Sequence, residues 1–404
     1  MSLFLRSRAI VAQTDTLGVT LAPDNVTKNQ NTDVSPASDS VVSPRTVEAN
    51  KLLGLELIRF LSAFAVLVFH YQHFQFRDGA LAPDFQRTRQ PFYAALSFLY
   101  EQGFHGVQLF WCISGFIFFW KYRETIAGGR LSGRRFFVLR FSRLYPLHLA
   151  TLLLVSLLLV LYHRTNGGLF VYHYNDLRHF ILQLFMASDW GFQKGESFDG
   201  PIWSISVEIL VYALFYSALV FIGKSWRVNV GVLTIWALLK TLNVHSPILD
   251  CAALFYAGGL SAMLYQSISN PRRRAAATVT AWCLVALITS LALVFDLLHR
   301  DRFQNLFLLV FTPVLLFCLC GDFKIGVTAR RCVEAAGNMT YSSYLLHFPL
   351  QLALVIGFTT FGIQIPFYHS GFFCVFMAGT LLASYYVYQY FELPAQRALR
   401  RRLG

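Results

Sequence analysis

Long apolar segments recur along this chain from Leu52 to Phe391, and each approaches the length of a membrane-spanning helix. Such a helix needs about 20 predominantly apolar residues. The composition agrees, because 55% of the 404 residues are hydrophobic and only 14% are charged, whereas soluble domains have about 25% charged residues. Too few polar side chains remain to cover a soluble globule of this size. We therefore expect an all-α fold, a polytopic integral membrane helical bundle.

We expect about ten transmembrane helices in this bundle. They cover roughly residues 53–73, 104–121, 144–163, 202–222, 229–244, 248–267, 276–296, 304–320, 339–361 and 371–391. An eleventh apolar patch, 180–190, either crosses the membrane or only lies at its interface. In the second case 19 Lys and Arg fall on one side of the membrane and eight on the other. The positive-inside rule favours that arrangement, with an interfacial or re-entrant segment, a long outer loop and both termini in the cytoplasm.

The segments outside the bundle are short. Residues 1–50 are rich in Asn, Ser, Thr and Asp without periodicity, so we expect a disordered cytoplasmic tail. Residues 51–396 form the expected transmembrane domain, and residues 397–404 a basic cytoplasmic tail. The net charge of +13 comes largely from short loops between apolar runs. The positive-inside rule explains these basic loops, so we expect no nucleic acid as a partner. The seven cysteines lack metal-ligand spacing, and we expect no metal.

Ionisable residues interrupt the first expected span. Arg59 and His70 are 11 residues apart, about three helical turns or roughly 16 Å, so both project from nearly one face at different depths. Residues of this kind within a span usually face a cavity or a partner. Snorkelling of Arg59 and an outer-interface position of His70 are the structural alternatives. The shared face favours an internal passage that both side chains reach.

Two polar groups in later spans add to this pattern. Ser204 and Glu208 are one helical turn apart beneath Trp203, at the start of the fourth span. A carboxylate there can orient or charge-balance a histidine, and a hydroxyl can bind a polar substrate. Tyr344 and His347 precede a proline in the ninth span. Interface anchoring by the tryptophan and interhelical hydrogen bonding in the ninth span are the alternatives.

A basic, aromatic-rich stretch leads into the third span. It contains Arg140 and Arg143, one helical turn apart, a spacing that suits two guanidinium groups to clamp phosphates. The alternative is a patch that sets the topology and contacts lipid headgroups.

Together these motifs resemble the acyltransferase 3 family of membrane proteins, the bacterial O-antigen and exopolysaccharide acetyltransferase type. The resemblance rests on the order of the motifs over roughly residues 52–396. The matching stretches are 55–70 with its Arg-x10-His spacing, 106–116, 140–146, 201–208, 341–349 and 391–394. We expect the stand-alone form, without the extracytoplasmic esterase-like domain that some relatives carry.

The resemblance implies transfer of an acyl group, most often acetyl, from cytoplasmic acyl-CoA to a hydroxyl of a glycan or lipid-linked saccharide at the bacterial inner membrane. It makes His70 the catalytic base or the acyl-accepting residue, with Arg59 its partner. Acetyl-CoA, or another acyl-CoA, is then the donor bound by Arg140 and Arg143. Both a direct transfer and a relay through an acyl-histidine agree with the sequence.

The remaining site residues complete this hypothesis. We expect Glu208 to be a catalytic residue whose carboxylate can orient or charge-balance a histidine, and we expect contacts with the substrate from Trp203, Ser204, Tyr344 and His347. Two rival functions stay open. A transporter or flippase of a polar or lipid-linked solute also places ionisable residues inside the membrane. A non-catalytic membrane receptor or sensor would leave the aligned ionisable residues unexplained.

Overall fold

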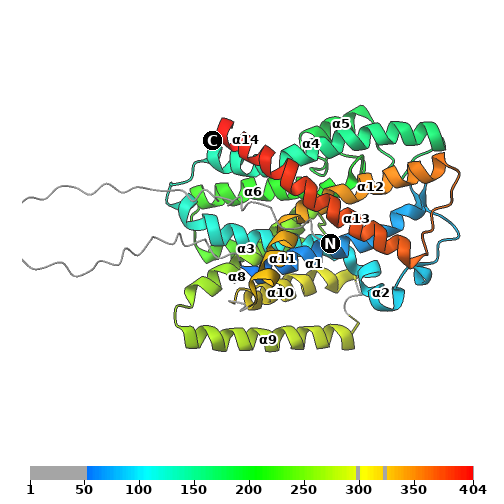
Figure 1. The fold of residues 1–404 in the computed structure, drawn as a ribbon. Helices are drawn as coiled ribbons and strands as arrows, with labels where there is room; N and C mark the ends of the chain where they lie inside the picture. Colours follow the sequence, from blue (N-terminus) through cyan, green and yellow to red (C-terminus); the bar gives the residue numbers. More distant parts are fainter. Residues whose placement is uncertain (1–51, 297–300, 322–324, 404) are drawn as a thin grey trace, which may run out of the picture. The chain divides into compact units, whose positions relative to one another are not determined.

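Helices dominate the chain in its computed structural model, which describes residues 52–296, 301–321 and 325–403 (Figure 1). The expected disordered tail, residues 1–50, lies outside the described residues. The longer helices are α1 (Leu53–His70), α3 (Gly106–Ala127), α4 (Gly133–Asn166), α6 (Trp203–Phe221), α8 (Pro247–Ser267), α9 (Pro271–Val294), α10 (Asp301–Leu319), α12 (Thr340–Thr360) and α13 (Ser370–Val387). The shorter helices are α2 (Tyr93–Gln102), α5 (Leu177–Leu184), α7 (Trp226–Thr241), α11 (Val327–Asn338) and α14 (Leu393–Leu403).

Short elements join these helices. The 3-10 helices are η1 (Tyr71–Gln75), η2 (Arg87–Arg89), η3 (Gly103–His105) and η4 (Gly200–Ile202), and a π-helical segment, η6 (Tyr388–Glu392), links α13 to α14. Strands β1 (Phe76–Arg77) and β2 (Ala80–Leu81) form an antiparallel hairpin. Its two turn residues, Asp78 and Gly79, both have positive φ, as a tight two-residue hairpin requires.

Eight helical segments in the described part of the chain are long and apolar enough to cross a membrane. They are Leu53–Gln75, Tyr93–Ala127, Gly133–Asn166, Gly200–Phe221, Pro247–Ser267, Pro271–Val294, Thr340–Thr360 and Ser370–Leu403. The other two expected spans correspond to shorter helices, the 16-residue α7 and the apolar part of α10. The ambiguous patch at 180–190 overlaps only the second half of the eight-residue α5, which is too short to span. The predicted polytopic helical bundle is thus confirmed, and the protein is an integral membrane protein.

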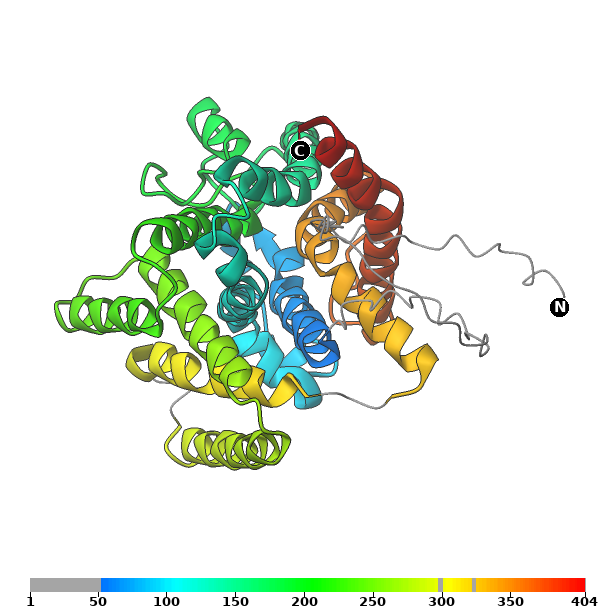
Figure 2. The same cartoon turned by 90° about the vertical axis from the view of Figure 1, so that its left-hand side faces the viewer.

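Helix α1 lies inside the bundle. It contacts α3, α11 and α12, and the view in Figure 2 shows it enclosed by them. Its buried face includes Leu55, Ala63, Val66 and Leu67, so the apolar side of the helix is used for packing against neighbours. Polar residues on α1 therefore face other helices inside the protein.

Helices α3 and α8 pack at close range through glycines. A Cβ atom at Gly115 would lie 1.8 Å from the backbone oxygen of Phe255, and one at Gly258 would lie 2.0 Å from that of Cys112. Only glycine permits such an approach, which is a common way for helices to associate within membranes. This contact fixes α3, which contributes one wall of the site described below.

Helix α4 is unusually long. Its 34 residues correspond to about 51 Å, compared with a hydrocarbon layer of about 30 Å. The Ser132 side chain caps its start by accepting from the backbone of Arg135, and Gly167 ends it in the left-handed conformation. Arg140 and Arg143 lie in its first third, before the apolar run.

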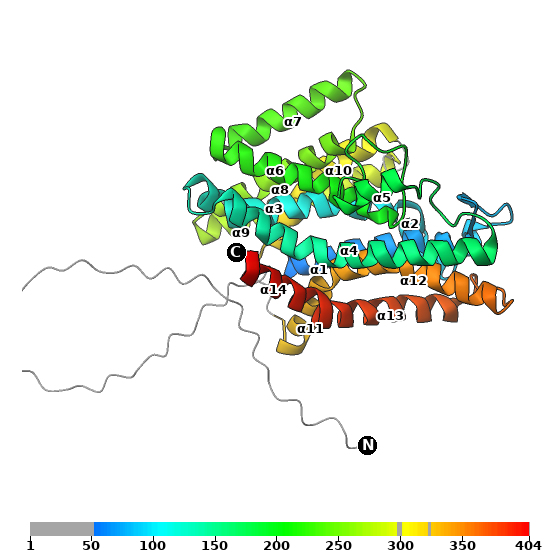
Figure 3. The same ribbon diagram turned by 90° about the horizontal axis from the view of Figure 1, so that it is seen from above.

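We call the end of the bundle at which α3 ends and α4 begins the basic end. The Arg-rich start of α9 and the end of α14 also lie there, at the left of Figure 1. Helix α9 runs along the periphery, with only Ala281 and Ala292 buried among its residues. Figure 3 shows α7 along one edge of the bundle and α13 along the opposite edge.

Candidate active site

The face of α1 that carries Arg59 and His70 lies against α12. Arg59 Nη2 donates to Thr340 Oγ1 over 3.3 Å, and His70 Nδ1 lies 2.9 Å from His347 Nε2. Thr340 and His347 are seven residues apart, which is two helical turns or about 10 Å. Both α1 side chains therefore face one partner helix, at two depths.

Three histidines, His70, His73 and His347, form what we call the histidine cluster. The rings of His70 and His347 are nearly parallel and lie edge to edge with centroids 5.0 Å apart, and His73 stacks on His70 at 4.7 Å. Gln351 Nε2 donates to the backbone oxygen of His70 over 2.8 Å. His347 is fully buried, whereas His70 remains partly exposed. His70 is thus the member of the hydrogen-bonded His70–His347 pair that a substrate can approach more easily.

The hydrogen bonds of this cluster assign the protons on two of its rings. His347 Nδ1 lies 2.7 Å from the backbone oxygen of Tyr344, which can only accept, so Nδ1 carries the proton. The Nε2 atom of a neutral His347 is then an acceptor, and His70 Nδ1 donates to it. Since His70 Nε2 makes no hydrogen bond with the described residues, its lone pair is free. His347 thus positions His70 with an available basic nitrogen.

A cavity of about 120 Å³ opens among α1, α3, α4, α6 and α12. We call it the arginine cavity, and its polar lining comprises Arg59, Ser114, Arg140, Arg143, Ser204, Glu208, Tyr212, Thr340, Tyr341 and Tyr344. The cavity reaches Tyr344, one helical turn before His347, but His70 does not line it. The single passage expected to expose both Arg59 and His70 is therefore not continuous among the described residues.

Arg59 lines the arginine cavity as half of an ion pair. Its Nη1 lies 2.9 Å from Glu56 Oε2, and both side chains are only 13% exposed. Helix α11 packs tightly on this pair, because a Cβ atom at Gly337 would lie 2.1 Å from Glu56 Oε2. The Arg59 charge is thus balanced within the bundle, so the expected snorkelling alternative does not describe it.

Two further guanidinium groups, those of Arg140 and Arg143, line the cavity. Arg140 Nη2 donates to the Tyr122 hydroxyl over 2.6 Å, and its guanidinium lies 4.8 Å from the centre of the Phe118 ring. Its Nε has no hydrogen-bond partner among the described residues. Neither Arg140 nor Arg143 forms an ion pair in the described part of the chain. Arginines in such a site favour an anion, and phosphate suits their geometry.

Glu208 lies in the arginine cavity and away from the histidines. Its carboxylate contacts the hydroxyls of Ser114 and Tyr212. Among the described residues it makes no hydrogen bond to His70, whose imidazole is bound by His347. Glu208 therefore does not orient His70 by a direct hydrogen bond in this arrangement, because the spacing along α6 shows which face Glu208 occupies but not which helix faces it.

The other expected substrate contacts divide into two groups. The Tyr344 hydroxyl donates to the backbone oxygen of Pro201 over 2.8 Å and lies 2.8 Å from Ser204 Oγ, and both residues line the cavity. Trp203 instead packs its ring edge-on against Trp111, with centroids 5.7 Å apart, and it does not line the cavity. Tyr344 and Ser204 thus form the boundary between the arginine cavity and the histidine cluster.

A buried acid precedes η4, outside the membrane-spanning segments. Asp199 is fully buried, and neither of its carboxylate oxygens has a hydrogen-bond partner among the described residues. Burial raises the pKa of Asp199 to about 7 from its usual 3.8, although the Thr151 hydroxyl opposes this shift. Burial, with a smaller contribution from Asp189, also raises the pKa of Glu196 to about 7.

We expect Asp199→Asn to raise the melting temperature above pH 7 and to leave it unchanged near pH 3. At pH 3 and below, Asp199 is largely protonated in both the folded and the unfolded wild type. Between about pH 4 and pH 7 only the unfolded state ionises, so the wild type loses up to about 4 kcal/mol of stability as the pH rises. Thermal unfolding in detergent across this range measures the difference. Asp84→Asn, at an exposed position, is the control, and a pH-independent difference for Asp199→Asn would contradict the prediction.

Comparison with family models identifies the kind of domain that carries this site. The model described as an acyltransferase domain, of the acyltransferase 3 type, matches residues 52–389. The chain belongs to the acyltransferase 3 family. The match extends from the start of α1 into η6, so it includes the histidine cluster and the whole lining of the arginine cavity. This member of the family is a membrane-bound acyltransferase, and no curated protein or solved structure matches it.

Proposed function

We propose that this acyltransferase moves an acyl group, acetyl in the simplest case, from acyl-CoA to a hydroxyl of a glycan or lipid-linked saccharide. The observation that carries the proposal is the free Nε2 of His70, held in place by His347. A neutral imidazole with an available nitrogen is the usual biological base for removing a proton from a hydroxyl.

The arginine cavity supports acyl-CoA as the donor. Arg140 and Arg143 are unpaired in the described part of the chain, and acyl-CoA carries several phosphates. The flexible arm of the donor separates these phosphates from the thioester. The phosphates then bind at the basic end while the thioester reaches past Tyr344 to His70. Movement of the Tyr344 and Ser204 side chains would join the two compartments.

Arg59 acts on the body of the donor in this proposal. Its contact on α12 lies about 10 Å along the helix from that of His70, which is too far for both side chains to contact the same carbonyl. Arg59, still paired with Glu56, holds a polar group of the donor along the path. For the same reason, Arg59 is poorly placed to stabilise an oxyanion that forms beside His70.

The chemical step needs only one base. His70 Nε2 takes the proton of the acceptor hydroxyl while its oxygen attacks the thioester carbon. The carbon–sulfur bond breaks, and the thiolate leaves with the proton that His70 releases. A relay through an acyl-histidine uses the same nitrogen first as the nucleophile.

Charge supports the orientation of the protein. The Arg-rich segments gather at the basic end, which we place in the cytoplasm with both termini, in the inner membrane of a bacterium. The histidine cluster then lies closer to the outer side, where a surface polysaccharide or its lipid-linked precursor is available as the acceptor.

The direct test uses the purified protein in detergent with labelled acetyl-CoA and a panel of glycans. We expect label to appear on a glycan hydroxyl and free CoA to accumulate. A protein that transports a solute but consumes no acetyl-CoA with any acceptor would contradict the proposal and favour the transporter hypothesis.

We expect the double variant Arg140→Gln/Arg143→Gln to raise the KM for acyl-CoA by at least about ten-fold. Each lost charge-assisted hydrogen bond to phosphate is worth about 1.5–3 kcal/mol. The kcat should change little, because neither side chain contacts the histidine cluster. Initial rates over a range of acyl-CoA concentrations separate the two constants.

The double variant Arg134→Gln/Arg135→Gln provides the matched control. It removes the same charge from the same helix at exposed positions outside the cavity. If both double variants raise the KM equally, bulk charge and not the cavity binds the donor. An unchanged KM in Arg140→Gln/Arg143→Gln would assign these arginines to topology alone.

A further inference from the structure

A second hollow lies on the periphery of the bundle, apart from the candidate active site. This apolar groove of about 950 Å³ opens between α9 and the helices α7, α8 and α10. Its walls include Leu260 and Leu264 of α8, Leu284 of α9 and Phe317 of α10. It shares no lining residue with the arginine cavity. The groove therefore needs an occupant of its own within the membrane.

The length of the groove matches one leaflet of a bilayer. Its α8 wall runs from Ala257 to Ser267 with lining residues three or four positions apart, which is one face of a helix. Ten residues of helix correspond to about 15 Å, half of the roughly 30 Å hydrocarbon layer. Ser267 ends α8 at the basic end. The groove therefore covers the depth of a single lipid tail in the leaflet at that end.

Among the described lining residues, most polar side chains lie near the basic end of the groove, and two others, Ser261 and Thr280, lie along its walls. Arg123, Gln266 and Ser267 line it where α3 and α8 end, and the half-exposed Trp226 borders it at the start of α7. Tryptophan favours the membrane interface. The groove thus has a cation and an indole at the interface and apolar side chains beyond them. This arrangement complements a phospholipid, whose phosphate lies at the interface and whose acyl chain lies in the hydrocarbon layer.

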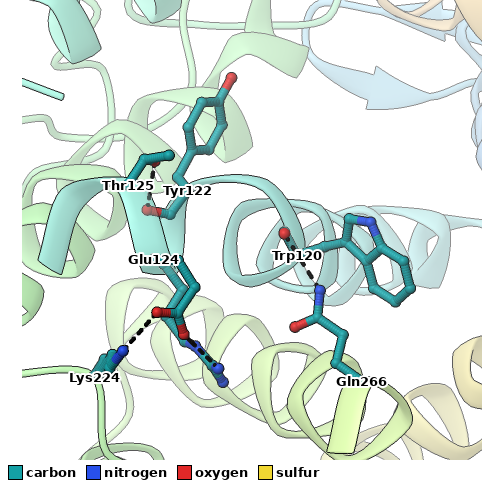
Figure 4. Close-up of polar contacts among 7 residues, drawn as sticks. Trp120, Tyr122, Glu124, Thr125, Lys224 and Gln266 are labelled. Carbon is teal, nitrogen blue, oxygen red and sulfur yellow. Dashed lines mark hydrogen bonds and ion pairs between the residues drawn. The ribbon is translucent and has the colours of Figure 1, made fainter. Parts of the chain in front are cut away.

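The Arg123 guanidinium at this end is held in place by the Glu124 carboxylate, which also binds Lys224. Arg123 Nη2 lies 2.8 Å from Glu124 Oε1, and Lys224 Nζ lies 2.6 Å from Glu124 Oε2. Figure 4 shows the contact between Glu124 and Lys224, and nearby the Gln266 side chain donating to the backbone oxygen of Trp120. Two cations share one carboxylate, so one positive charge is uncompensated at the mouth of the groove.

A second arginine reaches the same end from α9. Arg274 Nη2 donates to the backbone oxygen of Ile268 over 2.6 Å, and Ile268 lines the groove. Arg272 and Arg273 precede it at exposed positions. Basic residues just outside the hydrocarbon layer attract anionic headgroups. The mouth thus selects for an anionic lipid over a zwitterionic one.

We propose that this groove is a binding site for one anionic phospholipid of the leaflet at the basic end. One acyl chain lies between α8 and α9, and the phosphate lies between Arg123 and Arg274. The lipid fills space that α9 leaves open, since only two residues of this helix are buried, and so couples α9 to the rest of the bundle.

Native mass spectrometry of the full-length protein in detergent tests the site, with phosphatidylglycerol and phosphatidylcholine as probes. We expect one phosphatidylglycerol to bind in preference to phosphatidylcholine. Arg123→Gln should weaken phosphatidylglycerol binding about five-fold, the contribution of one basic residue near an anionic membrane surface, and should weaken phosphatidylcholine binding less, because the choline cation offsets the phosphate charge. Arg130→Gln, which removes an exposed charge from the neighbouring loop, should change neither.

A filled groove provides the second arm of the test. Thr280→Trp places a large side chain into the groove and should reduce binding of both lipids, whereas Val279→Trp, at an exposed position outside it, should not. Equal phosphatidylglycerol binding by Arg123→Gln and the wild type would overturn the anionic site. A stable dimer that retains no lipid would also overturn it, because a second copy would then cover the groove.

Discussion

Acyl transfer by the His70→Ala variant is expected to fall by at least about 100-fold, with folding and acyl-CoA binding retained. Loss of a positioned general base removes about 10²–10⁴ of rate, and alanine also removes the nucleophile needed for a relay. Label transfer from acetyl-CoA measures the loss. Retention of full transfer by His70→Ala would show that another group performs the proton transfer.

Two companion variants separate the chemical role of His70 from its surroundings. His347→Phe keeps an aromatic ring but removes the acceptor for His70 Nδ1, so it should lower kcat while the KM for acyl-CoA stays constant. His245→Gln changes an exposed histidine between α7 and α8 and should leave transfer unchanged. If His347→Phe matched the wild type at every pH, the proposed tautomer of His70 would be wrong.

The Gly258→Ala variant is expected to lose about 3 kcal/mol or more of stability, and Gly115→Ala should behave alike. Each new methyl group would meet a backbone oxygen at 2.0 Å or 1.8 Å, which neither a rotamer change nor a neighbouring side chain can relieve. Overpacking of this kind typically costs about 1–3 kcal/mol, and more when backbone must move. Thermal unfolding in detergent and the yield of monodisperse protein measure the effect.

Gly231→Ala provides a control of the opposite sign. No atom lies within 4 Å of a Cβ built at this α7 position, and alanine is favoured over glycine in a helix by up to about 1 kcal/mol. It should therefore be neutral or stabilising. If Gly258→Ala were equally well tolerated, the close approach of α3 and α8 would not be a determinant of the fold.

The fold was largely predictable because the membrane constrains it. A run of apolar residues that must satisfy its own backbone in lipid can only form a helix or a barrel, so the spans and the short segment at 180–190 followed from hydropathy and charge. The shared face of Arg59 and His70 followed from their spacing on one helix. Such arguments hold within a helix, where the geometry is fixed.

Contacts between helices were not predictable in the same way. The residue that orients His70 is His347, and nothing in the spacing along α6 or α12 shows which helix faces α1. His73 and Gln351 were not expected at the site at all, although His73 is three residues after His70 and Gln351 is four after His347. Both residues lie on the same helical face one turn after a predicted site residue, so this spacing could have identified them from the sequence.

The length of α4 determines where a highly charged donor would bind relative to the hydrocarbon layer of the membrane. Its first 11 residues precede the apolar run, so Arg140 and Arg143 lie about where hydrocarbon gives way to water. In the proposed function, a polyanionic donor held there stays close to water, and the two guanidinium groups neutralise part of its charge. Only the small, uncharged cargo has to enter the low-dielectric interior, and the large electrostatic penalty of carrying the whole molecule inward never arises.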